Sequence, residues 1–127
     1  MPQSKLFTPE RANQTLPLVR RIVKDILRIG QQVRSLSVEF EKFEENAEFN
    51  QWMDQLDELF AELEALGCSY KDWNFSVGLV DFPAVIRGKE VFLCWRSDEK
   101  ELKYYHEADA GYVGRKLIPQ NVCTSPK

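Results

Sequence analysis

The residues best suited to chemistry are concentrated between Gly78 and Arg115. This segment holds the only histidine, His106, together with the cysteine Cys94 and a carboxylate, Asp81, that stands between apolar neighbours. Ionisable side chains in an apolar context are costly to bury without a partner, so each needs either a partner or a function. The sequence therefore predicts a ligand site or a buried polar network with these candidate members: Asp81, Cys94, Arg96, His106, Glu107, Arg115 and Asn13.

Two kinds of chemistry are open to His106. It is suited to general base catalysis if Glu107 or Asp81 orients the imidazole, and to metal binding together with Cys94, Glu107 or Asp109. A single histidine without a recognised ligand spacing predicts no firm metal site, and Cys94, His106 and Glu107 are weak candidates. The favoured alternative is a partly buried histidine hydrogen-bonded to a carboxylate or a carbonyl group. The sequence assigns no catalytic residue and identifies no cofactor.

Cys94 and Asp81 each require a particular neighbour. A nucleophilic Cys94 would need a cation such as Arg96 or His106 to stabilise its thiolate, whereas a cysteine in a buried strand is usually inert. For the carboxylate of Asp81, Arg96 and Arg115 are the expected partners. Such a pair would either lock the fold or bind a ligand.

The N-terminal half of the chain is predicted to form two helices. Thr8 and Pro9 begin the first helix as N-cap and first helical residue, and it extends to about Phe43. Asn46 caps the second helix, which ends at Gly67. In both helices, apolar residues recur in alternating steps of three and four, the spacing of a coiled coil. They are Val19, Ile22, Ile26, Ile29, Val33, Leu36, Phe40 and Phe43 in the first helix, and Phe49, Trp52, Leu56, Leu59, Leu63 and Leu66 in the second.

The short link at residues 44–46 should fold the two helices into an antiparallel coiled-coil hairpin. The first helix is basic and the second acidic, which we interpret as a complementary, solvated surface rather than as a ligand site. The first helix is the longer one, and it leaves an apolar overhang that only the C-terminal segment can cover. Pro17 should kink this overhang, and Gly30 indicates close packing or flexibility further along. The overhanging residues are Leu16, Leu18, Val19, Ile22 and Val23.

After Gly67 the composition changes to short β-type runs separated by turn signals. Strands are predicted at 79–86, 91–96 and 102–107, and Pro83 should lie at an edge or a bulge. They form a small antiparallel three-stranded β-meander packed on the overhanging N-terminal part of the first helix. We therefore expect an α+β fold in a single domain, 1–127, that consists of a helical hairpin at 8–67, a β-module at 68–117 and a loose tail at 118–127.

The register of the last two strands decides which residues share a face with His106. A five-residue loop between the strands would pair Phe92 with His106 and Cys94 with Tyr104, and would place His106 and Cys94 on one face. A four-residue loop would instead place His106 on the face of Val91. The sequence does not distinguish between these registers.

Composition argues against several classes of protein. The start of the chain lacks the apolar core of a secretory signal, and no stretch approaches the roughly 18 apolar residues of a membrane span. Three cysteines without Cys-x-x-Cys spacing argue against a disulfide framework and suit a reducing compartment. The net charge of −3 argues against nucleic acid as a partner. We expect a cytoplasmic protein that does not contact membranes.

Short motifs along nearly the whole chain form a recognisable combination. They are the opening from Phe7 to Val19, then Lys71-Asp72, Gly78-Leu79-Val80-Asp81-Phe82-Pro83, Gly88-Lys89-Glu90-Val91, Leu93-Cys94-Trp95-Arg96, Tyr105-His106-Glu107, Gly111-Tyr112 and Gly114-Arg115. From Leu6 to about Leu117, the chain resembles the bacterial family catalogued as domain of unknown function 2203. The resemblance implies a small bacterial cytosolic protein, and no activity comes with it.

Two hypotheses of function follow. The favoured one is a non-enzymatic interaction or scaffold protein, in which surplus apolar residues such as Leu27, Met53 and Phe60 make the hairpin a homodimer and the sheet recognises a protein partner. The alternative is a small-molecule or metal-binding protein, which includes an enzyme. Its site would lie between the β-module and the first helix and would contain the candidate residues named above.

Overall fold

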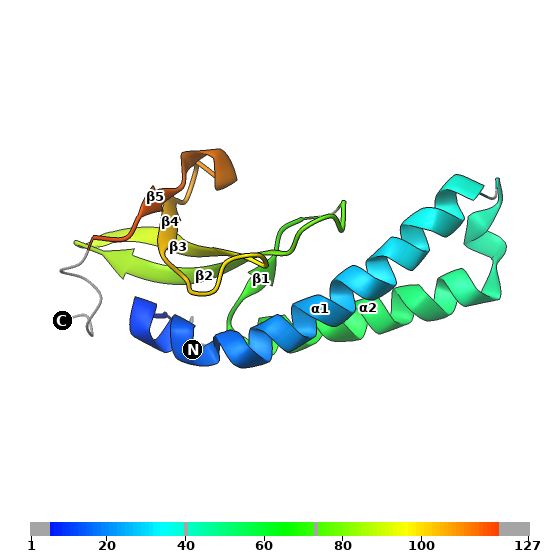
Figure 1. Cartoon of the computed structure of the whole chain (residues 1–127), viewed down its shortest axis with the longest axis horizontal. Helices are drawn as coiled ribbons and strands as arrows, with labels where there is room; N and C mark the ends of the chain where they lie inside the picture. Colours follow the sequence, from blue (N-terminus) through cyan, green and yellow to red (C-terminus); the bar gives the residue numbers. More distant parts are fainter. Residues whose placement is uncertain (1–5, 40, 73, 120–127) are drawn as a thin grey trace.

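The computed structural model describes residues 6–39, 41–72 and 74–119. Two long helices precede a five-stranded antiparallel sheet, so the predicted α+β class is confirmed (Figure 1). Within the described ranges, no helix combines the length and the apolar character needed to cross a membrane. The elements are, in chain order, α1 (Pro9–Glu39), the 3-10 helix η1 (Phe43–Glu45), α2 (Ala47–Leu66), β1 (Ser69–Tyr70), β2 (Leu79–Ile86), β3 (Lys89–Arg96), β4 (Tyr104–Glu107), the 3-10 helix η2 (Tyr112–Gly114) and β5 (Lys116–Leu117).

The sequence signals at the helix ends form the predicted caps. The backbone N–H of Arg11 donates to Thr8 Oγ1 at 3.1 Å, and that of Phe49 donates to Asn46 Oδ1 at 3.1 Å. Gly67 follows α2 in the left-handed conformation with φ 102°, which glycine adopts at no steric cost. Each cap satisfies backbone groups that a helix leaves unpaired, and these residues therefore determine where the helices begin and where α2 ends.

α1 continues without interruption through Pro17 and Gly30. The structure describes α1 as far as Glu39, and Phe40 lies outside the described residues. Phe43, the predicted last residue of the helix, belongs to η1 instead. Gly30 serves close packing rather than flexibility, since a Cβ atom at this position would overlap the aromatic ring of Phe75. The aromatic ring thus occupies the space that a side chain would fill.

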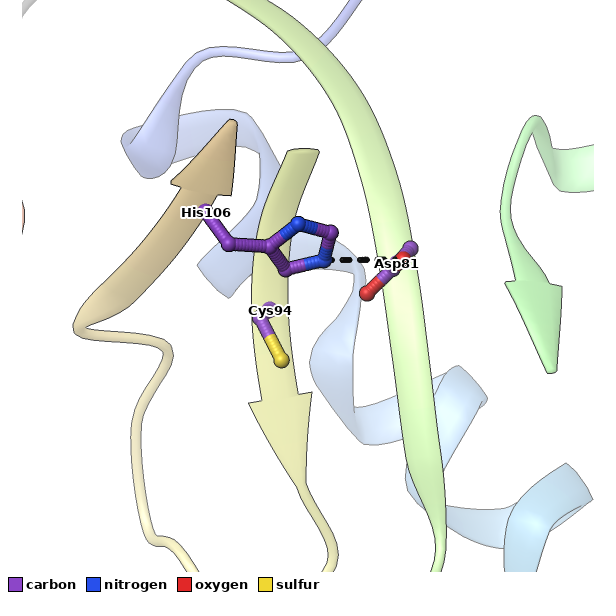
Figure 2. A group of neighbouring side chains, drawn as sticks. All are labelled: Asp81, Cys94 and His106. Atoms are coloured by element: carbon purple, nitrogen blue, oxygen red, sulfur yellow. Dashed lines mark hydrogen bonds and ion pairs between the residues drawn. The ribbon is translucent and has the colours of Figure 1, made fainter. Parts of the chain in front are cut away.

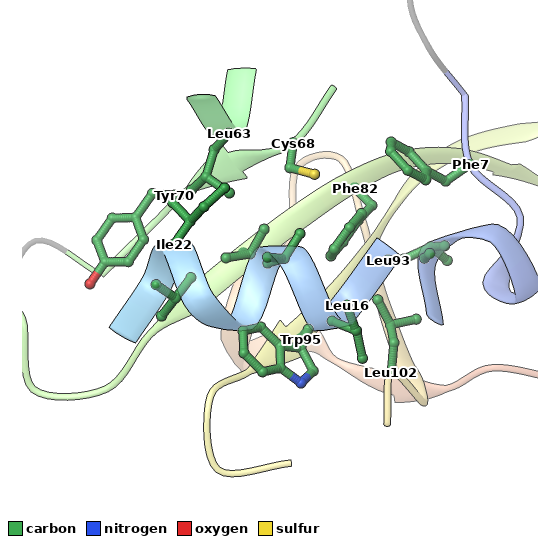
Figure 3. Packing of buried hydrophobic residues seen from close by; sticks show 14 of the residues in the cluster. Phe7, Leu16, Ile22, Leu63, Cys68, Tyr70, Phe82, Leu93, Trp95 and Leu102 are labelled. Carbon is green, nitrogen blue, oxygen red and sulfur yellow. The ribbon is translucent and has the colours of Figure 1, made fainter. Parts of the chain in front are cut away.

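α2 folds back along α1 and ends well short of the N-terminus of α1 (Figure 1). α1 has 31 residues and α2 has 20, a difference in length of about 16 Å. The sheet covers the part of α1 that α2 does not reach, as predicted, and forms one core with both helices (Figure 3). The expected burial of Leu18 is wrong, because this side chain is 43% exposed. The core here contains Leu16, Val19, Ile22, Val23, Val80, Phe82, Leu93, Trp95 and Leu102.

The strands are adjacent in space in the same order as in the chain, and each pairs antiparallel with its neighbours. β3 and β4 adopt the register that pairs Cys94 with Tyr104 and Phe92 with His106, the first of the two predicted alternatives. The sheet has five strands instead of the predicted three. β1 and β5 contain two residues each, which is too short for the alternating pattern that identifies a strand.

Pro83 lies in the part of β2 that has no β1 partner, since β1 pairs only with Val80 and Asp81. The backbone carbonyl of Pro83 accepts a hydrogen bond from the N–H of Phe7 at 2.8 Å. The missing N–H of proline therefore removes no ladder hydrogen bond between β2 and β3. This confirms the predicted edge position.

The alternation of side chains along the strands gives the sheet two different faces. On the inner face, Val80 and Leu93 belong to the core that includes α1. Asp81, Cys94 and His106 lie on the outer face, with α1 behind the strands (Figure 2). The sheet thus separates the apolar core from the residues that could do chemistry.

Asn13 joins α1 to the segment before β4 and has a structural role. Its Nδ2 donates to the carbonyl of Leu102 at 3.2 Å, and its Oδ1 accepts from the Leu102 N–H at 2.7 Å. Asn13→Ala leaves both backbone groups unpaired, so we expect the free energy of unfolding, measured by urea denaturation, to fall by about 1–3 kcal/mol. The control Gln14→Ala on the exposed surface should change it by less than about 0.5 kcal/mol. Equal stability of the two variants would contradict this role of Asn13.

Candidate functional site

Three neighbouring strands bring Asp81, Cys94 and His106 together (Figure 2). Asp81 comes from β2, Cys94 from β3 and His106 from β4, and their exposed fractions are 5%, 1% and 4%. Asp81 is opposite Cys94 in the β2–β3 ladder, and the β3–β4 register turns His106 to the same face. His106 Nε2 lies 3.0 Å from Asp81 Oδ2. The position of the site is therefore set by backbone register across three strands.

The hydrogen bond of the second ring nitrogen, Nδ1, determines whether Nε2 of neutral His106 carries a proton toward Asp81. Nδ1 lies 2.9 Å from the backbone carbonyl oxygen of Glu107, and a carbonyl oxygen only accepts hydrogen bonds. Nδ1 must therefore carry a proton, which in a neutral imidazole leaves Nε2 with a lone pair facing Asp81 Oδ2. Two acceptors at this separation need a cation between them or bound to them. That cation is either a proton or a metal ion.

Burial disfavours the charged forms of the two acidic groups at the site. It raises the pKa of Asp81, and His106 and Lys71 only partly offset this effect. Burial also raises the pKa of the Cys94 thiol to about 12. Without a bound cation, Cys94 is thus protonated at neutral pH, and it is a poor nucleophile in that state.

A pocket of about 290 Å³ adjoins the three side chains on the outer face. Lys71 is the one cationic side chain among the described residues that line it. The described residues provide the Lys71 ammonium with no hydrogen bond or ion pair, although its backbone N–H donates to Leu79. The remaining lining residues beside the cluster are Leu79, Phe92, Ala108, Gly111 and Tyr112.

Asp81, Cys94 and His106 each offer one potential metal-ligand atom, and these atoms lie within 4.8 Å of one another. The mixed oxygen, sulfur and nitrogen set is one that Zn²⁺ accepts. Glu107 is not part of it, because its carboxylate pairs with Lys89 at 3.0 Å and Lys116 at 3.6 Å. Asp81 thus takes the place that the sequence-based hypothesis gave to Glu107, whose contribution is its backbone carbonyl group.

The two arginines were wrongly expected to pair with Asp81. Arg115 makes a double hydrogen bond to Glu99, at 2.8 Å each, and a further one to the carbonyl of Cys94 at 3.1 Å. Arg96 bonds Asp98 through Nε at 2.8 Å. The predicted location between the sheet and α1 is also wrong, because the three clustered side chains lie on the opposite face. Asn13 is separated from them by the sheet.

The family model described as "Uncharacterized conserved protein (DUF2203)" matches residues 5–118. The chain belongs to this family. The comparison with curated proteins and the comparison with solved structures gave no match. For this DUF2203 member, any assignment of function must therefore come from the chemistry of its own residues.

Sequence reasoning missed two residues that shape the site. Lys71 was noted only as part of a family motif, and only the β1–β2 pairing brings it beside the pocket. Glu99 lies in the loop between the strands predicted at 91–96 and 102–107, yet it holds Arg115 through both carboxylate oxygens. Glu99 follows β3, which ends at Arg96, but Arg115 is too distant in sequence to be identified as its partner.

The paired arginines generate a prediction about stability. Arg115 and Glu99 have side chains only 12% and 20% exposed, and the Arg115 guanidinium lies 4.1 Å from the ring centroid of Tyr104. Arg115→Lys loses the double hydrogen bond, so the free energy of unfolding should fall by about 1–3 kcal/mol in chemical denaturation.

Arg96→Lys is the matched control for this prediction. The Arg96 and Asp98 side chains are 37% and 54% exposed, and a solvated ion pair contributes little to stability. The stability of this variant in chemical denaturation should therefore be indistinguishable from that of the parent protein. If both substitutions had equal effects, the Arg115–Glu99 pair would not be the stabilising one.

Proposed function

We propose that this protein binds a divalent transition-metal ion of the zinc class through Asp81, Cys94 and His106. The contact that carries the proposal is the 3.0 Å approach of His106 Nε2 to Asp81 Oδ2, with the Nδ1 proton committed to the carbonyl of Glu107. A cation must satisfy the two facing lone pairs. A metal ion does so and gives the neighbouring sulfur a role as well.

Two features of the donor geometry support a metal ion, although the contact is also one that a shared proton can make. Histidine ligands of metals usually donate their other N–H to a carboxylate or a backbone carbonyl, and His106 donates in this way to Glu107. In tetrahedral zinc sites, metal–ligand bonds of about 2.0–2.3 Å place ligand atoms roughly 3.3–3.7 Å apart. The His106–Asp81 separation of 3.0 Å is slightly below this range, so a metal ion would move these two atoms apart by about 0.3 Å or more and draw the longest pair in the cluster together by about one ångström.

Co²⁺ provides a direct test, because a thiolate ligand gives it a charge-transfer band in the near ultraviolet. We expect stoichiometric Co²⁺ binding by the metal-free protein, with this band and with tetrahedral visible bands that Zn²⁺ abolishes by displacement. Cys94→Ala should remove the charge-transfer band. Asp81→Asn and His106→Gln should weaken Co²⁺ binding roughly 100-fold or more, since each removes a ligand.

Glu107→Gln is the matched control, because its carboxylate contacts Lys89 and Lys116 instead of the cluster. It should bind Co²⁺ like the parent protein, and circular dichroism should show that every variant is folded. A folded parent protein that binds neither Co²⁺ nor Zn²⁺ would overturn the proposal. So would a charge-transfer band that persists in Cys94→Ala.

Homodimerisation through the hairpin remains a second proposal, and the half-buried apolar residues of α2 support it. Among the α2 residues, only Leu56 and Leu63 are buried, whereas Trp52, Met53 and Leu59 are half-buried against the core. A second copy that covers this apolar flank would remove it from water. Interaction with a protein partner, a bacterial origin and a cytoplasmic location are predictions of the same standing.

Sedimentation equilibrium tests the dimer. At micromolar concentration we expect twice the chain mass, and Met53→Glu should yield monomers because it places a charge on the half-buried flank. Gln51→Glu introduces the same charge at an exposed position of α2 and should leave the dimer intact. A parent protein that sediments as a strict monomer contradicts this proposal and leaves the metal site unaffected.

A further inference from the structure

The metal centre proposed above would use three protein ligands, and a tetrahedral ion has four positions. The pocket of about 290 Å³ adjoins Asp81, Cys94 and His106. The open fourth position can therefore face a space large enough for a small molecule, at the lower end of the range for ligand pockets. Closed structural zinc sites lack such a space.

The charges around this position select the kind of molecule. A dication bound by the Asp81 carboxylate, the Cys94 thiolate and a neutral His106 has no net charge, because the two anionic ligands balance it. Lys71 then leaves one positive charge beside the pocket, and it has no hydrogen bond or ion pair with the described residues. A bound monoanion would neutralise this charge.

The residues that line the pocket indicate the chemical character of the uncharged part of such an anion. Leu79 and Phe92 are apolar lining residues, and Ala108 and Gly111 leave room beside them because their side chains are small or absent. Gly111 has φ 69° and ψ −169°, a backbone conformation that is essentially restricted to glycine. Any other residue at position 111 would therefore strain the backbone at this edge of the pocket.

We infer that the site takes a small organic carboxylate, whose carboxyl group binds at the open metal position beside the Lys71 ammonium and whose apolar body contacts Leu79 and Phe92. This inference rests on the proposed metal site. It goes beyond it by assigning a ligand class to the pocket. An inorganic anion would use the metal and Lys71 equally well but would leave the apolar walls without contact.

Butyrate is a suitable probe, titrated into the Co²⁺-loaded protein while the visible bands are recorded. We expect a saturable change in these bands, which report the coordination of the ion. Acetate should bind more weakly, by up to about fourfold for each methylene group it lacks. Butyramide, the neutral counterpart of butyrate, should leave the spectrum unchanged.

Lys71→Gln should weaken butyrate binding about fivefold, the upper range for a solvated ion pair. Lys71→Arg should retain most of the butyrate affinity. Lys89→Gln is the matched control, because Lys89 pairs with Glu107 outside the pocket, and it should bind butyrate like the parent protein.

The outcomes separate the two proposals. Absence of cobalt binding would overturn the proposed function and this inference with it. Cobalt bands that butyrate does not change, or that butyramide changes equally, would overturn this inference alone. Equal affinity for acetate and butyrate would show an anion site without contact to the apolar walls. Equal butyrate affinity of Lys71→Gln and the parent protein would show that Lys71 does not contribute to the site. Either result overturns the inference as stated.

Discussion

The difference in length between α1 and α2 is the constraint on which the rest of the structure depends. Because α2 stops short, the N-terminal part of α1 exposes apolar side chains that need another cover, and burial of such surface is the main favourable term in folding. The sheet provides this cover with its inner face alone. Its outer face is therefore released from packing against the helices, and it can hold polar side chains that would be too costly in the core.

The helical half of this architecture could be predicted because its determinants are local. Thr8, Asn46 and Gly67 act within a few residues of themselves, and the apolar spacing defines which sides of the two helices meet. The need for the sheet to cover α1 also followed from helix lengths alone. The strands β1 and β5 could not be found in this way, because two residues carry no period.

The sequence predicted the residues of the candidate site better than it predicted their arrangement in space. Asp81, Cys94 and His106 were all identified as side chains in need of partners, yet Asp81 was assigned to the wrong ones. Charge alone favoured Arg96 and Arg115, whereas the pairing of three strands decides which groups meet. The face of the sheet was also beyond the sequence, since apolar residues occur on both sides of β3 and do not indicate which side contacts α1.

Asp81, Cys94 and His106 come from three successive strands. A single ion bound by all three would therefore link β2, β3 and β4 through their side chains. The backbone hydrogen bonds fix the distances between these strands, and a shared cation would fix the distances between the three ligand atoms. Strand pairing and cation binding would therefore each restrict the motion of the same side chains. In an unfolded chain the three groups have no fixed separation, and the binding free energy of a cation therefore contributes directly to folding. A shift of one residue in the register between β3 and β4 would turn His106 to the inner face, away from Asp81 and Cys94. Occupancy of the site would thus report that the strands have paired correctly.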